Sequence, residues 1–210
     1  MSKNLTTTIL FLMFCVNIFA QNGKKLSESE KAIFEQKMVE QSKKIETLQC
    51  NFVQEKTSVL VAQKAVSKGI MLYALPSKLR WEYTEPTPST LILNGQNAAL
   101  LDKNGQKIGN DKAIKPLGNI IISMINGDGI KNNRQFSTEI YETDKHFLII
   151  LTPIQKRLKE FYKNIELKID KHTFLASEIT MNEKSGDKMV ISLINKKLNE
   201  KIDVSKFVIK

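Results

Sequence analysis

Histidine is scarce in this chain of 210 residues, which contains only His146 and His172. Neither lies at ligand-like spacing from a cysteine, an aspartate or the other histidine, so the sequence indicates no zinc site. The chain also lacks the Gly-x-Ser-x-Gly motif of hydrolases, a phosphate-binding loop and a dinucleotide-binding fingerprint. We therefore predict no catalytic residue, no metal and no cofactor, and we expect that the protein is not an enzyme.

Cysteine is just as scarce, with Cys15 and Cys50 as the only two. Removal of an N-terminal signal peptide would leave Cys50 alone, so that no internal disulfide could form. Cys50 and a distant histidine could act as a nucleophile and its base, but no neighbouring residue supports that interpretation. We expect a small, buried thiol at the start of a strand.

The N-terminal apolar run is too short to cross a bilayer comfortably, which makes a retained membrane anchor the weaker interpretation. Lys3 provides a positive start, residues 9–16 are apolar, and residues 18–20 form a cleavage site before Gln21. This pattern predicts a secretory signal peptide over residues 1–20.

Lipid attachment to Cys15 is not expected, because the bulky Phe14 precedes it where lipoprotein processing requires a small residue. Residues 21–210 then form a soluble, exported chain that is long enough for one sizeable domain. No linker or low-complexity segment divides it.

Positive charge exceeds negative charge, with 32 Lys and Arg against 22 Asp and Glu, for a net charge of +10. The excess could attract anionic membrane surfaces or acidic partners. The lysines are spread along the chain, however, so a well-solvated surface explains the charge at least as well. Export and the lack of a basic helix or known motif argue against nucleic-acid binding.

The only tryptophan lies in residues 78–86, where apolar and polar residues alternate. A period of two is typical of a strand with one apolar face. Residues 69–75 alternate in the same way, and Pro76-Ser77 between the two runs supplies turn chemistry. We predict an antiparallel hairpin over residues 69–84. Its apolar face carries Met71, Tyr73, Leu75, Leu79, Trp81 and Tyr83.

Two segments predict helices. Ser27 and Glu30 form a capping box, and apolar residues follow at roughly helical spacing, which predicts an amphipathic helix over about residues 28–47. Residues 114–126 are short, isoleucine-rich and bounded by helix start and stop signals. We predict a short helix there, with a buried strand as the alternative.

The rest of the chain predicts strands about every ten residues, separated by turn signals such as Asn94-Gly95 and Asn104-Gly105. The predicted strands cover residues 51–56, 58–66, 90–93, 98–102, 107–108, 135–141, 146–152, 158–169, 173–182, 188–197 and 206–209. This spacing without interleaved helices indicates a mainly β protein with a continuous antiparallel sheet, barrel or sandwich. Such a sheet needs its concave face covered, and the two helices either fill that face or cap a cavity for an apolar ligand.

The ordered set of motifs resembles the periplasmic outer-membrane lipoprotein carrier family, the LolA type. The motifs are Phe52-x-Gln54, the Gly69-x-x-x-Tyr73-x-x-Pro76 run with Arg80-Trp81-x-Tyr83-x-x-Pro86, Leu91-Ile92-x-Asn94-Gly95, Leu148-x-x-Leu151-Thr152-Pro153, Ile191-x-Leu193-x-Asn195 and Val204-Ser205-Lys206-Phe207. The resemblance covers nearly all of residues 21–210, which it implies form a single LolA-like domain.

The resemblance implies an unclosed, strongly curved antiparallel β-barrel in which the N-terminal helix and the short helix form a lid over a hydrophobic cavity. It implies a monomeric periplasmic carrier that receives acylated lipoproteins from an inner-membrane ABC transporter and delivers them to an outer-membrane acceptor. The implied cavity and lid residues are Phe52, Met71, Tyr73, Leu75, Leu79, Trp81, Tyr83, Leu91, Leu93, Ile121, Met124 and Ile125.

Two departures from the family leave room for another amphiphilic cargo, such as a glycolipid or pigment lipid. Well-studied members latch the lid with an arginine directly before the hairpin proline, where this chain has Leu75. The latch is therefore absent or lies elsewhere. The chain also ends at Lys210, without the C-terminal extension of some carriers. A protein with a filled core and no ligand is the remaining alternative.

Overall fold

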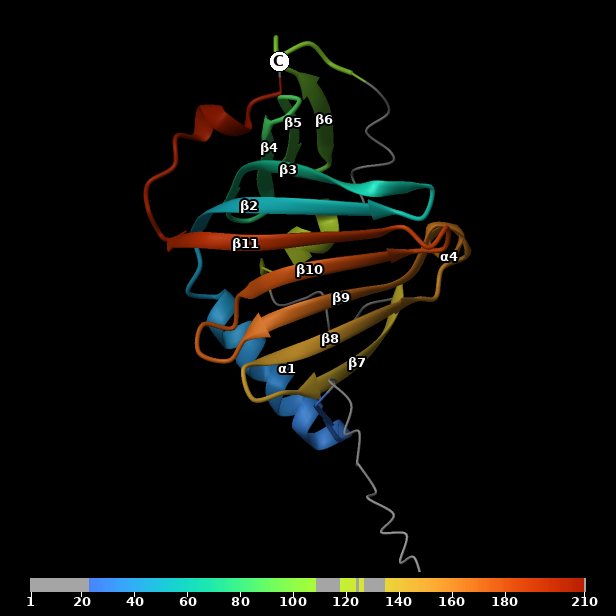
Figure 1. Ribbon diagram of the computed structural model, residues 1–210. Helices are drawn as coiled ribbons and strands as arrows, with labels where there is room; N and C mark the ends of the chain where they lie inside the picture. The colour runs from blue at the N-terminus through green and yellow to red at the C-terminus, as the bar shows by residue number, and fades with distance from the viewer. Residues whose placement is uncertain (1–22, 109–117, 124, 127–134, 210) are drawn as a thin grey trace, which may run out of the picture.

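One open antiparallel sheet organises the computed structural model, which describes residues 23–108, 118–123, 125–126 and 135–209 (Figure 1). Eleven strands follow the order β1-β7-β8-β9-β10-β11-β2-β3-β4-β5-β6. The first and last strands of this order do not pair with each other, so the barrel is not closed. The mainly β, unclosed fold predicted from the sequence is confirmed. The predicted signal peptide lies outside the described residues.

The elements follow the predicted spacing with few exceptions. Their bounds are β1 Lys24–Lys25, α1 Glu28–Ser42, β2 Thr47–Ser58, β3 Val61–Ala74, β4 Lys78–Glu85, β5 Ser89–Asn94, β6 Asn97–Asp102, β7 Phe136–Glu142, β8 His146–Pro153, α4 Lys156–Phe161, β9 Tyr162–Asp170, β10 Ala176–Glu183, β11 Lys188–Leu198 and the 3-10 helix η1 Val204–Phe207. Residues 118–123 and 125 are also helical, and we call them the isoleucine-rich helix. This agrees with the short helix predicted there rather than with the alternative strand.

The hairpin around the only tryptophan is confirmed as β3 and β4. Met71 pairs with Trp81, and Tyr73 pairs with Leu79. All four side chains are buried, because residues two apart on a strand point to the same face of the sheet.

The first helix begins as predicted and ends earlier. Ser27 accepts from the Glu30 backbone N–H, and the Glu30 carboxylate accepts from Ser27, so the capping box is present. The helix ends at Ser42 instead of continuing to residue 47. Ile45 and Leu48 are buried, but they belong to the connection and to β2. Apolar spacing alone could not separate them from the helix.

Four strand predictions differ from the structure in their bounds or their type. Residues 58–66, predicted as a strand or a strand-rich connection, and residues 69–75 are not separate, because β3 runs without a break from Val61 to Ala74. Residues 158–161 belong to α4, a short run whose apolar spacing suits either structure. Residues 107–108 make only an isolated bridge, between Leu101 and Lys107. Residues 204–207 form η1, whose Asp203 side chain caps the first turn by accepting from Ser205 N–H.

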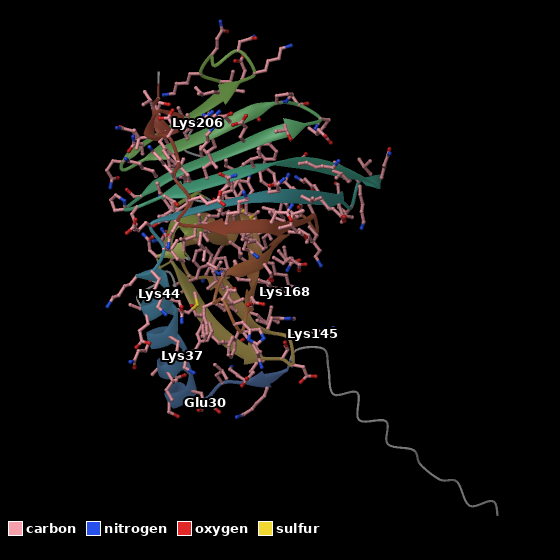
Figure 2. The ribbon with its side chains drawn as sticks, turned by 90° about the vertical axis from the view of Figure 1, so that its left-hand side faces the viewer. Glu30, Lys37, Lys44, Lys145, Lys168 and Lys206 are labelled. Atoms are coloured by element: carbon pink, nitrogen blue, oxygen red, sulfur yellow. The ribbon has the colours of Figure 1, made fainter. Side chains whose placement is uncertain are left out.

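The two faces of the sheet are covered differently. Figure 2 shows α1, with Glu30, Lys37 and Lys44, on one side of the sheet, away from Lys145 and Lys168. On that covered face Phe34 of α1 packs on Phe147 of β8, with ring centroids 4.7 Å apart. Most buried apolar side chains belong to this face, so it holds the main core.

The C-terminal segment covers part of the opposite face. Ile92, Ala99 and Leu101 form a small apolar cluster there with Ile209. Arg80 donates to the carbonyl oxygen of Lys206 at 3.2 Å, and Asn94 donates to that of Phe207 at 3.3 Å. These two contacts fasten the chain end to β4 and β5. None of the helices in the described part of the chain is long and apolar enough to cross a membrane.

Candidate functional site

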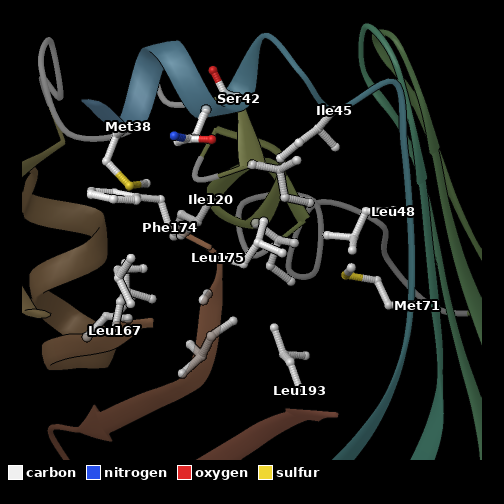
Figure 3. A pocket seen from close by; sticks show the side chains of 17 residues that line it. Met38, Ser42, Ile45, Leu48, Met71, Ile120, Leu167, Phe174, Leu175 and Leu193 are labelled. Atoms are coloured by element: carbon white, nitrogen blue, oxygen red, sulfur yellow. The ribbon is translucent and has the colours of Figure 1, made fainter. Parts of the chain in front are cut away.

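An apolar cavity lies between the covered face of the sheet and the helices above it (Figure 3). The helices contribute from above and the strands from below, as Met38 and Leu193 show on opposite sides of the space. The residues that line it are Met38, Gln41, Ser42, Ile45, Leu48, Met71, Ile120, Ile121, Ile125, Ile165, Leu167, Ile169, Phe174, Leu175, Ala176, Ile179 and Leu193.

Strand alternation explains the floor of the cavity. Ile165, Leu167 and Ile169 occupy every second position of β9, and all three are buried. Ile179 of β10 pairs directly with Leu167, so neighbouring strands present their apolar side chains together. The result is a continuous hydrocarbon surface across the strands.

The roof comes from α1 and the isoleucine-rich helix. Met38, Gln41 and Ser42 belong to the last turns of α1, and Ile120 and Ile121 to the isoleucine-rich helix. The hydroxyl of Ser42 donates to the carbonyl oxygen of Val39 at 2.8 Å, so it is satisfied inside its own helix. The cavity therefore offers an apolar ligand little competition from polar side chains.

The described residues leave little free space in the cavity. Its free volume is about 30 Å³, which is room for one or two water molecules. An acyl chain does not fit among these side chains unless they move apart.

The isoleucine-rich helix starts in close contact with the sheet. A Cβ atom added at Gly118 would lie 2.0 Å from Leu93 Cδ1 and 3.5 Å from Leu79 Cδ2. The missing side chain lets the backbone approach β4 and β5 at this point. Leu79 and Leu93 therefore support the roof from below.

A hydrogen-bonded latch joins the far end of this helix to the β3–β4 hairpin. The Tyr73 hydroxyl donates to Oδ1 of Asn126, and Asn126 Nδ2 donates to the carbonyl oxygen of Pro76 at 3.2 Å. The Tyr73 ring is buried in β3. Tyr73 and Asn126 thus connect the roof to the β3–β4 hairpin, two residues away from Leu75.

An aromatic cluster fills the covered face beside the cavity. Phe52 stacks on Trp81 with ring centroids 4.2 Å apart and an interplanar angle of 24°. Tyr83 meets Phe52 edge-on at 5.2 Å and donates its hydroxyl to Gln54 at 2.9 Å. A Cβ atom at Gly69 would lie 2.4 Å from Phe52 Cζ, so this packing requires glycine there. The cluster is a solid part of the core.

The structure places the predicted site residues either in the cavity lining, in the core beside it, or outside both, and one of them is not described. Met71, Ile121 and Ile125 line the cavity. Buried beside it are Phe52, Tyr73, Leu79, Trp81, Leu91 and Leu93, with Tyr83 partly buried in the same core cluster.

Two predicted residues remain, Leu75 and Met124. Leu75 lies outside the cavity with 45% of its surface exposed, because β3 ends at Ala74 and the strand alternation stops there. Met124 lies outside the described residues.

Most of the floor was missed in the sequence. Ile165, Leu167, Ile169, Ile179 and Leu193 line the cavity but were predicted only as members of strands. Their alternation was visible in the sequence and could have identified an inward face. It could not show that the free space under the roof lies over these residues rather than over the apolar residues of β4 and β5.

Reactive groups do not gather at this site. The described residues contain no group of three or more His, Cys, Asp or Glu side chains that could hold a metal ion. Cys50 is fully buried in β2, and burial raises the pKa of its thiol to about 12. A thiol in that state is not a nucleophile at neutral pH. The lining of the site is suited to contact with apolar groups.

The arrangement defines a class of open antiparallel sheets with an apolar, helix-covered cavity. Within that class, the chain belongs to the LolA family. The family model described as "Outer membrane lipoprotein carrier protein LolA" matches residues 43–210. The resemblance inferred from the sequence is confirmed by this match. No curated protein sequence matches the chain.

Solved structures share the fold at low sequence identity. An uncharacterized conserved protein from Thermus thermophilus has a TM-score of 0.54 at 8% identity, over 83% of this chain and 91% of that one. MucB has a TM-score of 0.52 at 10% identity, over 87% of this chain and 63% of its own. A LolA superfamily protein from Nitrosomonas europaea is 14% identical over 83% of this chain and 97% of its own, with a TM-score of 0.44. At these identities the likeness concerns the fold alone.

We predict that the Cys50 thiol of the folded protein resists iodoacetamide at neutral pH and reacts fully in urea, measured by mass spectrometry of the Cys50 peptide. Because burial raises the folded-state pKa to about 12, and an unfolded thiol has a pKa near 8.5, the protonated thiol favours the folded state. The contribution of this thiol to the free energy of unfolding is fully present below about pH 8.5 and is lost as the pH rises toward 12. A Cys50→Ala variant should lose this dependence between pH 8.5 and 10. Rapid alkylation of the folded protein would contradict the burial.

Proposed function

We propose that the protein is a periplasmic carrier that binds the acyl chains of lipoproteins in its cavity and moves them from the inner toward the outer membrane. The observation that carries this proposal is the apolar cavity between the sheet and the two helices. Family membership supports it, since the family is described by that transport role. An inner-membrane ABC transporter as donor and an outer-membrane acceptor are part of the proposal, as is action as a monomer.

The size of the hydrophobic effect explains why such cargo needs a carrier. Burying one methylene is favoured by about 0.8 kcal/mol, so moving one long acyl chain from its apolar site into water costs on the order of 10 kcal/mol. Spontaneous escape into an aqueous compartment is then rare. A floor of Ile, Leu and Met side chains replaces the membrane interior without demanding a particular polar group.

The small free volume of the cavity implies that binding includes an opening step. The sheet strands are joined by continuous backbone ladders, while the isoleucine-rich helix meets β4 and β5 through side chains and through the Tyr73–Asn126 contact. We therefore assign the movement to the roof. The Tyr73–Asn126 latch takes the place of the arginine that this chain lacks at Leu75.

Another amphiphile, such as a glycolipid or pigment lipid, is the alternative cargo. The observation that favours it is the apolar cavity lining. Among the described residues that line the cavity, Gln41 and Ser42 are the only polar ones, and none carries a charge that could select a headgroup. The same cavity would accept any long hydrocarbon chain. The two proposals differ in cargo and share the binding site.

Native mass spectrometry of protein isolated from its own cell envelope tests the function. We expect a bound acylated lipoprotein or its acylated N-terminal peptide. A bound glycolipid or pigment lipid would favour the alternative cargo. Protein without any bound lipid, together with failure to bind a fluorescent fatty-acid probe, would contradict both and would indicate a filled core.

We predict that Ile125→Gln weakens binding of a fluorescent long-chain fatty acid by about tenfold, because a buried amide without a partner costs about 1–3 kcal/mol. Ile125 lines the cavity and is only partly buried, so the variant should fold. The matched control is Asn119→Gln, at an exposed position of the same helix. Equal binding by the two variants, with equal melting temperatures, would place the acyl chain elsewhere.

We predict that Tyr73→Phe strengthens apparent binding of the same probe by up to about fivefold. One hydrogen bond of the latch is worth about 1 kcal/mol, and its loss raises the population of the open roof. Tyr141→Phe is the control, because the Tyr141 hydroxyl contacts Glu139 within β7 at 3.3 Å. Unchanged binding and association rates in Tyr73→Phe would show that this contact does not hold the roof closed.

A further inference from the structure

An exposed apolar tip closes the β2–β3 hairpin. Val59 and Leu60 form the turn between the strands, and Val61 begins β3. Leu60 is 90% exposed, Val59 64% and Val61 57%. Tight turns usually carry Gly, Asn, Asp, Ser or Pro, because those residues suit the turn backbone and face water without cost. Three apolar residues at such a place indicate a contact outside the molecule.

The tip is held in a defined conformation. Oδ1 of Asp187 accepts from the Ser58 hydroxyl at 3.0 Å and from the Val59 backbone N–H at 3.1 Å. A Cβ atom at Gly186 would lie 2.8 Å from Val59 Cγ1, so the β10–β11 turn touches the tip directly. The hairpin therefore presents its apolar residues on a fixed support.

A second apolar side chain lies on the same end of the sheet. Figure 1 shows α4 beside the ends of the β2–β3 and β10–β11 hairpins. The Lys184 backbone N–H donates to the carbonyl oxygen of Phe161 at 2.9 Å, which joins α4 to the β10–β11 turn. The Phe161 side chain is more than half exposed. We call Val59, Leu60, Val61 and Phe161 the apolar end.

Basic side chains outnumber acidic ones on the segments that form and adjoin the apolar end. Lys56 pairs with both Glu183 and Asp187, and Lys64 pairs with Glu55, so two cations face three carboxylates in these ion pairs. Exposed cations outside those ion pairs are Lys156, Arg157, Lys159, Lys163, Lys184 and Lys188. On the same segments, Glu160 is the exposed acidic residue among those described. The combination of apolar tips and surrounding cations complements a surface with anionic headgroups above hydrocarbon.

We propose that the apolar end docks on an anionic phospholipid bilayer, with Leu60 inserted below the headgroups and the surrounding lysines at their level. A protein partner with an apolar groove would not by itself explain the excess of exposed cations on these segments. Docking at this end requires no ligand in the cavity, so it stands or falls separately from the proposed carrier function.

The test is flotation of the purified protein with vesicles of phosphatidylglycerol and phosphatidylethanolamine, compared with vesicles of phosphatidylcholine alone. We expect binding to the anionic vesicles only, with loss at high salt because exposed charges are screened. Leu60→Ser should reduce partitioning about tenfold, in line with removing one buried leucine from the membrane. Lys184→Gln should reduce it about fivefold, as expected for one lysine near an anionic surface.

Val204→Ser is the matched control, since Val204 is 66% exposed and lies in η1, away from the apolar end. It should float like the parent protein, and all three variants should keep the parent melting temperature. Absence of flotation with anionic vesicles would overturn the proposal, as would equal flotation of Leu60→Ser and Val204→Ser. Fatty-acid probe binding should be the same in Leu60→Ser and the parent, so its failure in both would count against the carrier function alone.

Discussion

The structure depends on one constraint, which is that an open sheet with an apolar face must be covered. Eleven strands satisfy each other's backbone groups along the ladder, yet they leave one broad hydrocarbon surface. Closing the sheet into a barrel would have buried that surface without further elements. Here α1 and the isoleucine-rich helix cover it, so the stability of the sheet and the presence of a cavity have the same origin.

The covered face has a part packed with stacked aromatic rings and a part with mainly aliphatic side chains. Around Trp81, the stacked ring of Phe52 and the close approach at Gly69 give tight packing. Around Leu167, aliphatic side chains from several strands face the roof, and Phe174, which packs near Phe34 and Phe147, is the only aromatic residue among the described residues that line the cavity. Aromatic stacking fixes geometry, whereas aliphatic and methionine side chains adapt to different shapes. A binding site that accepts varied hydrocarbon is better placed in the second part.

Much of the fold could be predicted from the residues, because period-two alternation and turn residues act locally. The β3–β4 hairpin followed from alternation on both sides of one turn, and in the structure its register pairs Met71 with Trp81. The capping box at Ser27 located the start of α1 within a residue. Its end was misplaced because Ile45 continues the apolar spacing after the helix has stopped.

The position of the cavity could not be predicted in the same way. Alternation shows that Trp81 and Leu167 both face inward, but it does not show which of them lies under a gap in the packing. That gap depends on how closely the isoleucine-rich helix approaches the sheet. The contact of Gly118 with Leu93 of β5 sets this distance. A contact between distant segments leaves no periodic signal in the sequence.

The attachment of the roof by side chains has a consequence for the dynamics of the protein. Backbone amides of β9, β10 and β11 are hydrogen-bonded on both sides within the sheet, so their hydrogen exchange requires the ladder to break. Under the proposed carrier function, the isoleucine-rich helix separates from the sheet while the ladder stays intact. Its amides would then exchange through a smaller opening than those of the strands, and the free energy of that opening would measure the work of loading the cavity. Thermal unfolding reports on the ladder and would be insensitive to that work.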